Sequence, residues 1–410
     1  MKKRYWFISI ISVFILGAVF FSLARKRNNH STFYGEYMYD SLYPSCSYSE
    51  KNVFYLADYG ILHLIDTDSG KDIIYCDKPN CTHERYSHNN ENPSCPAVFY
   101  GLCKSGIVVH NGHLYFLGNM TDEDFCTQYL YEMDVNGENR KSVVALPGIE
   151  NIRYVLYRDN YVIGGYYNRV ELNDENQIIN ENKPEAGIFV IDLENYEFYK
   201  GEILTGEQIN ITDISYENGF VYYSIVRFND DVTEKVIADA TEGDFADFIY
   251  NNQMYEIYKY DIKNKEDVLI TVIDHVYDLN LIGMDAYYTT KDGYYKFDTA
   301  SGEKVSLDAV KKTVPKDKVF FYGFKSDGND LYFSYRDESN ECVYCRLKEN
   351  DVIELMRLPD EKAFGFVCIC GTSVYINYND DEGKFCLGVI NINDLNSGVY
   401  KPKKLRYYNE

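Results

Sequence analysis

Three cysteines and one histidine lie close together in a short polar stretch of this chain, at Cys76, Cys81, His83 and Cys95. Their spacing, C-x4-C-x-H-x11-C, is not that of a standard zinc finger, but three thiolates and one imidazole suit tetrahedral zinc. Four protein ligands leave no open coordination position, so such a site orders a loop rather than catalysing a reaction. We therefore predict a structural zinc site in which the ligand atoms lie about 3.5–4 Å apart.

Two alternatives remain open for the same four residues. Outside the cell, a disulfide between two of the cysteines would restrain the stretch equally well. The thiols could also be free, and the total of eleven cysteines is odd, so they cannot all pair within one chain. Glu84 and His88 are further potential ligands nearby. Cys103 and Cys126 could form a disulfide of their own.

A second group of cysteines lies near the end of the chain. Cys342 and Cys345 have the spacing of a redox motif, but positions three apart in a predicted strand face opposite sides. A thioredoxin-type site also needs a helix N-terminus. Cys368 and Cys370 share a face, and we expect them to be small buried hydrophobic residues.

Catalytic motifs are absent from the sequence, which contains no G-x-S-x-G, H-E-x-x-H or P-loop pattern. The segment Asp66–Asp72 resembles a calcium loop, but Gly70 stands where the fifth ligand belongs, so a turn is the better interpretation. The net charge of −23 repels phosphate backbones and excludes nucleic-acid binding. A hydrophobic content of 45% is ample for a folded core.

The N-terminus predicts the compartment. Lys2, Lys3 and Arg4 precede the uncharged run Tyr5–Ala24, and Arg25 and further basic residues follow it. A run of about 20 apolar residues spans a bilayer core. We expect residues 1–30 to be an uncleaved signal anchor and residues 31–410 an extracytoplasmic domain, in a single-pass protein of the cell membrane. Cleavage after Ala24 would instead release a secreted protein.

A short motif, a turn residue followed by alternating apolar and aromatic residues, recurs seven times along the rest of the chain. The copies begin at Asn52, His113, Asn160, Phe220, Asp285, Asp330 and Ser373. A second strand follows each copy, and in several units it ends in an Asp-initiated turn, as at Asp66–Gly70, Asp298–Gly302 and Asp394–Gly398. Asp and Gly are the residues of tight hairpin turns. Strands punctuated in this way predict antiparallel sheets.

Each repeat of about 40–65 residues has room for four strands, which predicts an all-β chain folded as a β-propeller. We predict seven four-stranded blades, preceded by one N-terminal transmembrane helix. The segment Phe33–Ser47 could add an innermost or an outermost strand, so six or eight blades remain open. The only tryptophan is Trp6, which argues against propellers that rely on Trp in every blade.

Three segments exceed a minimal blade: Cys76–Cys95, Arg169–Ala186 and Asn229–Gln253. They fall on connections that share one end of the blades, so we expect them to crowd one face. In the last segment, Asp231 is a suitable N-cap with Glu234 three residues later, which predicts a helix over Asp231–Phe248. Its apolar stripe would pack on the propeller itself or, alternatively, form a lid or a docking surface.

The residues Tyr75–His83 and Ser94–Ala97, the Tyr-rich repeats and the N-terminal apolar segment together resemble exported β-propeller proteins of clostridial Gram-positive bacteria, of the DUF5050-like kind. The resemblance spans nearly the whole chain, and it implies a propeller exposed outside the cytoplasm without an assigned activity. Many such proteins look like lipoproteins, whereas this sequence lacks the lipobox cysteine.

We expect a membrane-anchored binding or scaffold module at the cell envelope, with a protein or glycan as its ligand. Propellers concentrate ligands at one end of the central channel, where tyrosines supply amphipathic contact surface. The alternative is an extracytoplasmic carbohydrate-active enzyme, either a polysaccharide lyase or a glycosidase. That alternative requires histidines or paired carboxylates that converge at the channel mouth.

Overall fold

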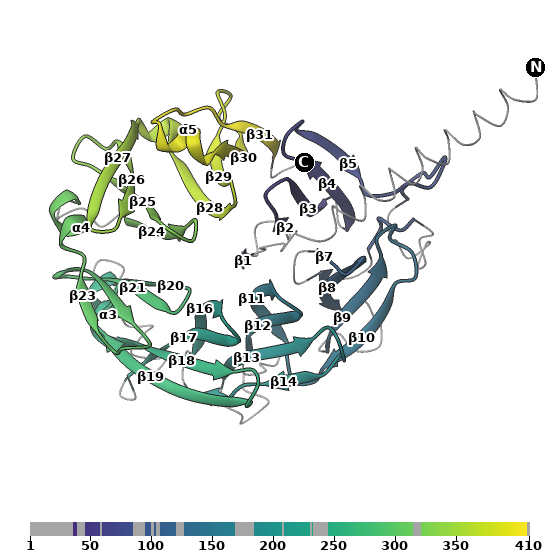
Figure 1. The fold of residues 1–410 in the computed structure, drawn as a ribbon, viewed down its shortest axis with the longest axis horizontal. Coiled ribbons are helices and arrows are strands. Elements are labelled where there is room, and N and C mark those ends of the chain that lie inside the picture. Colours follow the sequence, from purple (N-terminus) through teal and green to yellow (C-terminus); the bar gives the residue numbers. More distant parts are fainter. Residues whose placement is uncertain are drawn as a thin grey trace, which may run out of the picture.

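Seven small antiparallel sheets stand around a central axis, so the chain is an all-β propeller with seven blades (Figure 1). The computed structural model describes residues 36–38, 46–57, 60–84, 95–99, 102–103, 107–119, 127–168, 184–206, 209–229, 232, 245–314 and 321–407. The predicted N-terminal helix therefore lies outside the described residues. Within them, no helix is both long enough and apolar enough to cross a membrane.

The strands of blades 1, 4, 5, 6 and 7 follow one another in chain order from the axis outward (Figure 1). Blade 1 contains β2 (Cys46–Tyr48), β3 (Asn52–Ala57), β4 (Ile61–Asp66) and β5 (Lys71–Ile74). In blade 2, β6 (Leu102–Cys103) and β7 (Val108–His110) both pair with β8 (His113–Asn119), followed by β9 (Gln128–Asp134) and β10 (Lys141–Leu146). Blade 3 contains β11 (Asn151–Arg158), β12 (Tyr161–Asn168), β13 (Glu185–Asp192), β14 (Phe198–Lys200) and β15 (Leu204–Thr205).

The remaining blades each have four strands. Blade 4 contains β16 (Asn210–Glu217), β17 (Phe220–Phe228), β18 (Gln253–Asp261) and β19 (Glu266–Asp274), and blade 5 contains β20 (Asp278–Ile282), β21 (Asp285–Thr290), β22 (Gly293–Asp298) and β23 (Lys304–Ser306). Blade 6 contains β24 (Phe321–Ser326), β25 (Leu331–Arg336), β26 (Cys342–Lys348) and β27 (Asp351–Leu358), and blade 7 contains β28 (Phe364–Cys370), β29 (Ser373–Asn379), β30 (Phe385–Asn391) and β31 (Lys403–Tyr407).

The repeated motif is the second strand of each blade, which confirms the predicted repeat and the count of seven. Of the predicted segment Phe33–Ser47, the structure describes 36–38 and 46–47, and Cys46 and Ser47 belong to β2, the innermost strand of blade 1. A further strand, β1 (Glu36–Met38), pairs with β11 of blade 3 near the middle of the ring (Figure 1).

Turn residues behave as the sequence predicts, with one exception. The backbone N–H of Ser69 donates to Asp66 Oδ1 at 2.6 Å, and that of Ser301 donates to Asp298 Oδ1 at 2.9 Å. The predicted turn at Asp394–Gly398 is wrong in detail, because a short helix, α5 (Ile392–Asn396), replaces it. The Asn391 side chain caps this helix by accepting a hydrogen bond from Asn393 N at 2.9 Å. Leu395, on the inner side of the helix, is fully buried.

Within the described residues, two other helices and one 3-10 turn decorate the ring: α3 (Phe245–Asn252), α4 (Asp308–Thr313) and η1 (Asp360–Lys362). The helix α3 overlaps the predicted helix over 245–248 and ends four residues beyond Phe248, whereas the predicted N-cap Asp231 lies outside the described residues. Its aromatic side chains contact the propeller, since Phe248 lies against Phe228 and Tyr250 against Tyr277. These contacts favour packing on the propeller's own face.

The core lies mainly between neighbouring blades, where flat sheet faces pack on one another. Tyrosine is prominent there, and six of the largest fully buried side chains are Tyr166, Tyr223, Tyr260, Tyr332, Tyr344 and Tyr375. A tyrosine ring fills space between two sheets, and in Tyr344 and Tyr375 the hydroxyl also reaches a backbone carbonyl of the next blade. Tyr344, for example, donates to the carbonyl of Phe364 at 2.8 Å.

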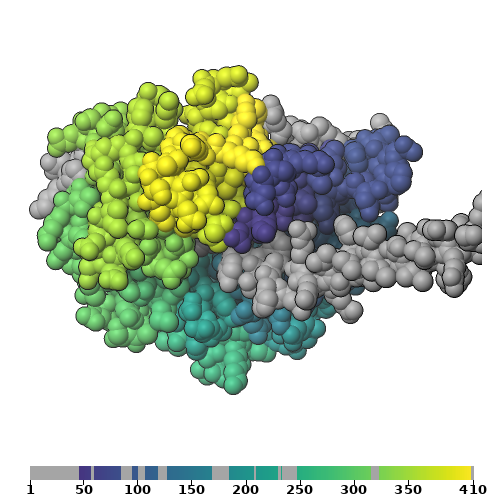
Figure 2. All heavy atoms as spheres, turned by 45° about the horizontal axis from the view of Figure 1, so that its top comes forward, coloured from purple at the N-terminus to yellow at the C-terminus, as the bar shows by residue number. Residues whose placement is uncertain are grey.

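Blades 1 and 7 come from opposite ends of the chain and lie side by side (Figure 2). They share no strand in the described residues, so side chains close the ring. A joint core cluster contains Tyr48, Val53, Tyr375 and Leu405. Lys403 Nζ of blade 7 donates to the carbonyl of Thr67 in blade 1 at 3.0 Å.

Candidate metal centre

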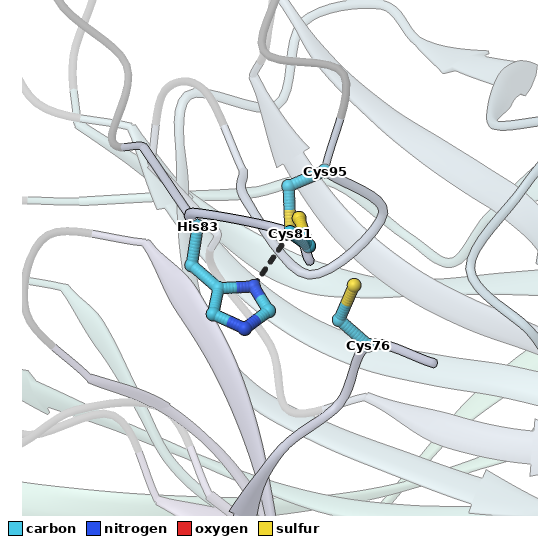
Figure 3. Close-up of side chains that lie close together, drawn as sticks. All are labelled: Cys76, Cys81, His83 and Cys95. Carbon is cyan, nitrogen blue, oxygen red and sulfur yellow. Dashed lines mark hydrogen bonds between the residues drawn. The ribbon is translucent and has the colours of Figure 1, made fainter. Parts of the chain in front are cut away.

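The connection from blade 1 to blade 2 begins at the end of β5 and carries the four predicted ligands (Figure 3). Cys76 is two residues past β5, and Cys81 and His83 follow in a loop without regular secondary structure. Cys95 opens the described segment 95–99, which turns back onto blade 1 through a bridge between Val98 and Ile61. The site is therefore assembled from both ends of one connection.

The structure brings all four predicted residues together. One ligand atom from each of Cys76, Cys81, His83 and Cys95 lies within 4.8 Å of the others, and the group could hold a metal ion. The Nδ1 atom of His83 is 3.3 Å from the sulfur of Cys95 (Figure 3). Some separations exceed the predicted 3.5–4 Å, so the ligands would contract by up to about 1 Å around zinc, whose bonds to sulfur are about 2.3 Å.

The backbone of the loop is shaped to turn its side chains inward. Asn80 has φ of 58° and His83 has φ of 51°, the left-handed region that Asn and His adopt more readily than most residues. The backbone N–H of Cys81 donates to the carbonyl of Lys78 at 3.3 Å, which closes a tight turn just before the second ligand. These local features place Cys81 and His83 on the same side as Cys76.

The far end of the site is held against blade 2. Arg140, which immediately precedes β10, donates to the carbonyl of Pro96 at 2.7 Å and to that of Val98 at 2.9 Å. Its guanidinium also lies 3.9 Å from the centre of the Phe99 ring. On the blade 1 side, Phe99 N donates to the carbonyl of Gly60 at 2.7 Å. Cys95 is thus positioned by contacts with both blades.

The thiols differ in their electrostatic surroundings. A hydrogen bond from the backbone N–H of His83 lowers the pKa of Cys81. Burial raises the pKa of Cys95 to about 12. Binding of a metal would therefore have to displace a proton from Cys95, and the partly exposed Cys81 is converted to a thiolate ligand more readily than Cys95.

The three cysteines of the site are free thiols, so the structure does not show the disulfide alternative. Glu84 does not belong to the group, and His88 lies outside the described residues. The possible pair of Cys103 and Cys126 cannot be placed, because the described part of the chain omits Cys126 and the side chain of Cys103.

The second group of cysteines agrees with its predicted buried role. Cys342 packs in the cluster between blades 6 and 7, whereas Cys345 packs in the cluster on the opposite face of blade 6. Cys368 and Cys370 share a face with their sulfurs 3.9 Å apart and are 3% exposed. Cys342 and Cys345 are free thiols.

One polar network was missed by the sequence analysis. His63 Nδ1 lies 2.9 Å from Asp72 Oδ1, and the Tyr55 hydroxyl donates to the same carboxylate. Arg406 of blade 7 lies over the Tyr55 ring at 3.8 Å. The only available signal was that Tyr55, His63 and Asp72 fall on three successive strands. These strands are β3, β4 and β5, so none of the three residues lies on β2, the innermost strand of blade 1.

No family model matches this sequence, and no curated protein matches it either. Solved structures share its fold. The acylaminoacyl peptidase of Pyrococcus horikoshii is 12% identical over 93% of this chain and 54% of its own, with a TM-score of 0.50. A prolyl endopeptidase is 10% identical over 92% of this chain and 49% of its own, with a TM-score of 0.54. The β-propeller domain of the Trilobed protease from Pyrococcus furiosus is 12% identical over 90% of this chain and 99% of its own, with a TM-score of 0.49. The chain spans about half the length of the first two structures, and what it shares with them is the β-propeller fold.

Proposed function

We propose that this chain is a membrane-anchored binding or scaffold propeller at the cell envelope, and that zinc bound by Cys76, Cys81, His83 and Cys95 orders the connection between its first two blades. The observation that carries the proposal is the cluster of four ligand atoms within 4.8 Å. Four protein ligands complete a tetrahedral zinc site, so no position is left for a substrate. The metal would then stabilise the propeller and take no part in chemistry.

The chemistry of the donors fits zinc better than a hard cation. Calcium and magnesium take oxygen ligands, whereas soft thiolates select zinc, copper(I) or iron. The connection also needs an ordering contribution, because the stretch between Lys78 and Pro96 is rich in Asn and other polar residues and has few apolar side chains. A metal ion gathers such a stretch only when the fold brings its ligands together, so binding energy becomes folding energy.

The location and the partner rest on the sequence. The uncharged run Tyr5–Ala24 between two basic clusters supports an anchor in the cell membrane. A domain exposed at the envelope would meet proteins and glycans, and these are the ligand classes that we propose. The likeness to peptidases concerns the fold alone and does not favour an enzymatic function.

The test is metal analysis with thiol counting on the purified full chain. We expect about one zinc per chain, and loss of that zinc in the Cys81→Ser and His83→Gln variants. Cys386→Ser removes a free thiol from blade 7, outside the cluster, and should leave the zinc content unchanged. Circular dichroism checks that each variant retains its β-sheet. Zinc-free protein in which two of the cluster thiols resist alkylation until reduced would overturn the metal in favour of a disulfide.

A further inference from the structure

The outermost strand of blade 4, β19, has an open edge. Among the described strands it pairs only with β18, so the backbone N–H and C=O groups of its other edge face away from the sheet. It is nine residues long and lies on the rim of the ring (Figure 1). An unpaired edge of this length is a template for pairing with another strand.

This edge strand also exposes apolar side chains. Val268 is 56% exposed, Leu269 46% and Val272 47%. The other large hydrophobic residues exposed in the described part of the chain occur singly, on different strands or in connections: Ile73, Val135, Ile203, Val305 and Ile353. Scattered single residues are normal on a protein surface. On β19, three lie within five residues, and the register with β18 puts Val268 on one face and Leu269 and Val272 on the other. A strand added at this edge would therefore meet apolar side chains on both of its faces.

Charges interrupt the outer strands β27 and β31 but not the middle of this one, and β10, which also carries no charge over Ser142–Leu146, buries its Val144 and Leu146. In β27, Glu354 and Arg357 interrupt the strand, and in β31 the exposed Lys404 does so. Charged side chains on an edge strand oppose pairing with a foreign strand. The six residues Val268–Ile273 carry no charge. A bulge near Ile270 bends β19, but β10, β27 and β31 contain a comparable bulge, so it does not set this strand apart.

The two ends of β19 are acidic. Glu266 is exposed at one end, and the Asp274 side chain is 79% exposed at the other. Lys265, beside Glu266, is turned onto the ring of Tyr199 at 3.7 Å. A second copy of β19 would fit poorly, because antiparallel pairing about Ile270 sets Glu266 of each copy opposite Asp274 of the other. Like charges directly opposite are destabilising.

We propose that β19 accepts an extended strand from a partner protein, one with β-branched residues in its centre and Lys or Arg at both ends. Backbone hydrogen bonds along the open edge would supply affinity, the exposed Val268 and Val272 would pack on the central residues, and the acidic ends would select basic ones. This gives the proposed binding function a class of partner and rests on that function for its biological setting.

The probe is a fluorescein-labelled peptide, Lys-Lys-Val-Thr-Ile-Thr-Val-Lys-Lys, titrated with the full chain and followed by anisotropy. We expect saturable binding that weakens at least tenfold in the Val268→Lys/Val272→Lys variant. The matched control is Val305→Lys/Ile353→Lys, which places the same two charges on exposed positions of β23 and β27 and should change affinity less than twofold. Replacing the peptide's lysines with glutamates should weaken binding at least tenfold, and N-methylation of alternate amides should abolish it.

Equal weakening by the two double variants, binding that survives N-methylation, or no binding to the wild-type chain would each overturn the proposal. The proposal would also be overturned if the wild-type chain sedimented as a dimer and the Val268→Lys/Val272→Lys variant as a monomer. The strand that pairs with β19 would then come from a second copy of this chain. Zinc content is measured on the same samples. A failed peptide titration with intact zinc contradicts the strand-binding inference alone, and retained peptide binding without zinc contradicts the metal site alone.

Discussion

The hydroxyl of Tyr375 in blade 7 donates a hydrogen bond of 2.6 Å to the carbonyl of Ser49 in blade 1, across 326 residues of chain. Beside it, Ser373 Oγ donates to the carbonyl of Glu50 at 2.7 Å, and the carboxylate of Glu50 accepts from Thr372 Oγ1 at 2.9 Å. Because no described strand is shared between these two blades, this small group of polar contacts and the apolar cluster behind it hold the ring closed.

Removing one hydroxyl from the contact between blades 1 and 7 should lower the stability of the propeller. Tyr375→Phe loses a partly buried hydrogen bond, and we expect the free energy of unfolding to fall by about 0.5–1.5 kcal/mol. Tyr344→Phe should cost more, about 1–3 kcal/mol, because its hydroxyl also accepts from Phe364 N, and that buried N–H would be left without the hydroxyl. Denaturant unfolding of both variants measures the difference. An unchanged unfolding midpoint for Tyr344→Phe would contradict this ranking.

Asp72 and Asp267 occupy equivalent positions in blades 1 and 4, but their contributions to the stability of the fold should change with pH in opposite directions. Burial alone would raise the pKa of Asp72, but hydrogen bonds from His63 and Tyr55 outweigh it and hold the pKa below the usual value. Burial raises the pKa of Asp267, which accepts from the Tyr223 hydroxyl at 2.8 Å.

A depressed carboxyl pKa stabilises the fold above the unfolded pKa of about 4 and ceases to do so as pH falls through the folded pKa. The stability lost in Asp72→Asn should therefore shrink below about pH 4. A raised pKa has the reverse effect, so the stability lost in Asp267→Asn should grow as pH falls toward 4. Thermal unfolding at several pH values between about 3 and 7 measures both. Parallel pH profiles for the two variants would show that the two sites do not differ in this way.

Close packing between strands should make the fold sensitive to substitution of Gly164. In β12, a Cβ on Gly164 would lie 2.1 Å from the ring of Phe189, its partner on β13. Because that ring is fully buried, we expect Gly164→Ala to cost about 1–3 kcal/mol. Gly365 in β28 is the matched control, since nothing lies within 4 Å of its added Cβ. Gly365→Ala should stay within about 0.5 kcal/mol of the wild type in the same unfolding assay.

Removal of the proposed zinc should destabilise the connection between blades 1 and 2. At free zinc about 1,000 times the dissociation constant, linkage alone contributes about 4 kcal/mol, so a strong chelator should lower the melting temperature. Limited proteolysis should then cut between Asn80 and Pro96 first, because these residues lose their ordering ligand. The His83→Gln variant is the control, as chelator should change its melting temperature far less. Identical proteolysis patterns with and without chelator would count against the site.

The N-terminal anchor remains a prediction, because Tyr5–Ala24 lies outside the described residues. We expect the full chain to sediment with membranes and its propeller to be cut by protease added outside the cell. The Leu16→Arg/Phe20→Arg variant should reduce the membrane fraction, since charges at the centre of a spanning helix cost about 2.5–3.5 kcal/mol each. Recovery of the unaltered full-length chain in the soluble cytoplasmic fraction would refute the anchor.

Much of the architecture could be predicted because it follows from patterns among residues that are close in sequence. The alternation in segments such as Val53–Tyr55 follows from the two-residue period of a strand, and seven copies of it indicate seven blades. Asp66 and Asp298 open their turns with side-chain hydrogen bonds to residues two or three positions away. At Asp394 the same signal failed, because burial of Ile392 and Leu395 against blade 7 favoured a helical turn over a hairpin.

The candidate metal ligands illustrate where prediction from the sequence ends. Cys76, Cys81 and His83 are close in sequence, so their types alone suggested a common site. The position of Cys95 depends on the residues that come after it, which contact Gly60 in blade 1 and Arg140 before β10. No local sequence pattern predicts these contacts. The pairing of His63 with Asp72, the hydrogen bond from Tyr375 to Ser49 and the open edge of β19 likewise depend on which strands become neighbours. The sequence determined the repeat and its turns through local backbone preferences, whereas only the packing of distant segments decided which polar groups meet and which edges stay exposed.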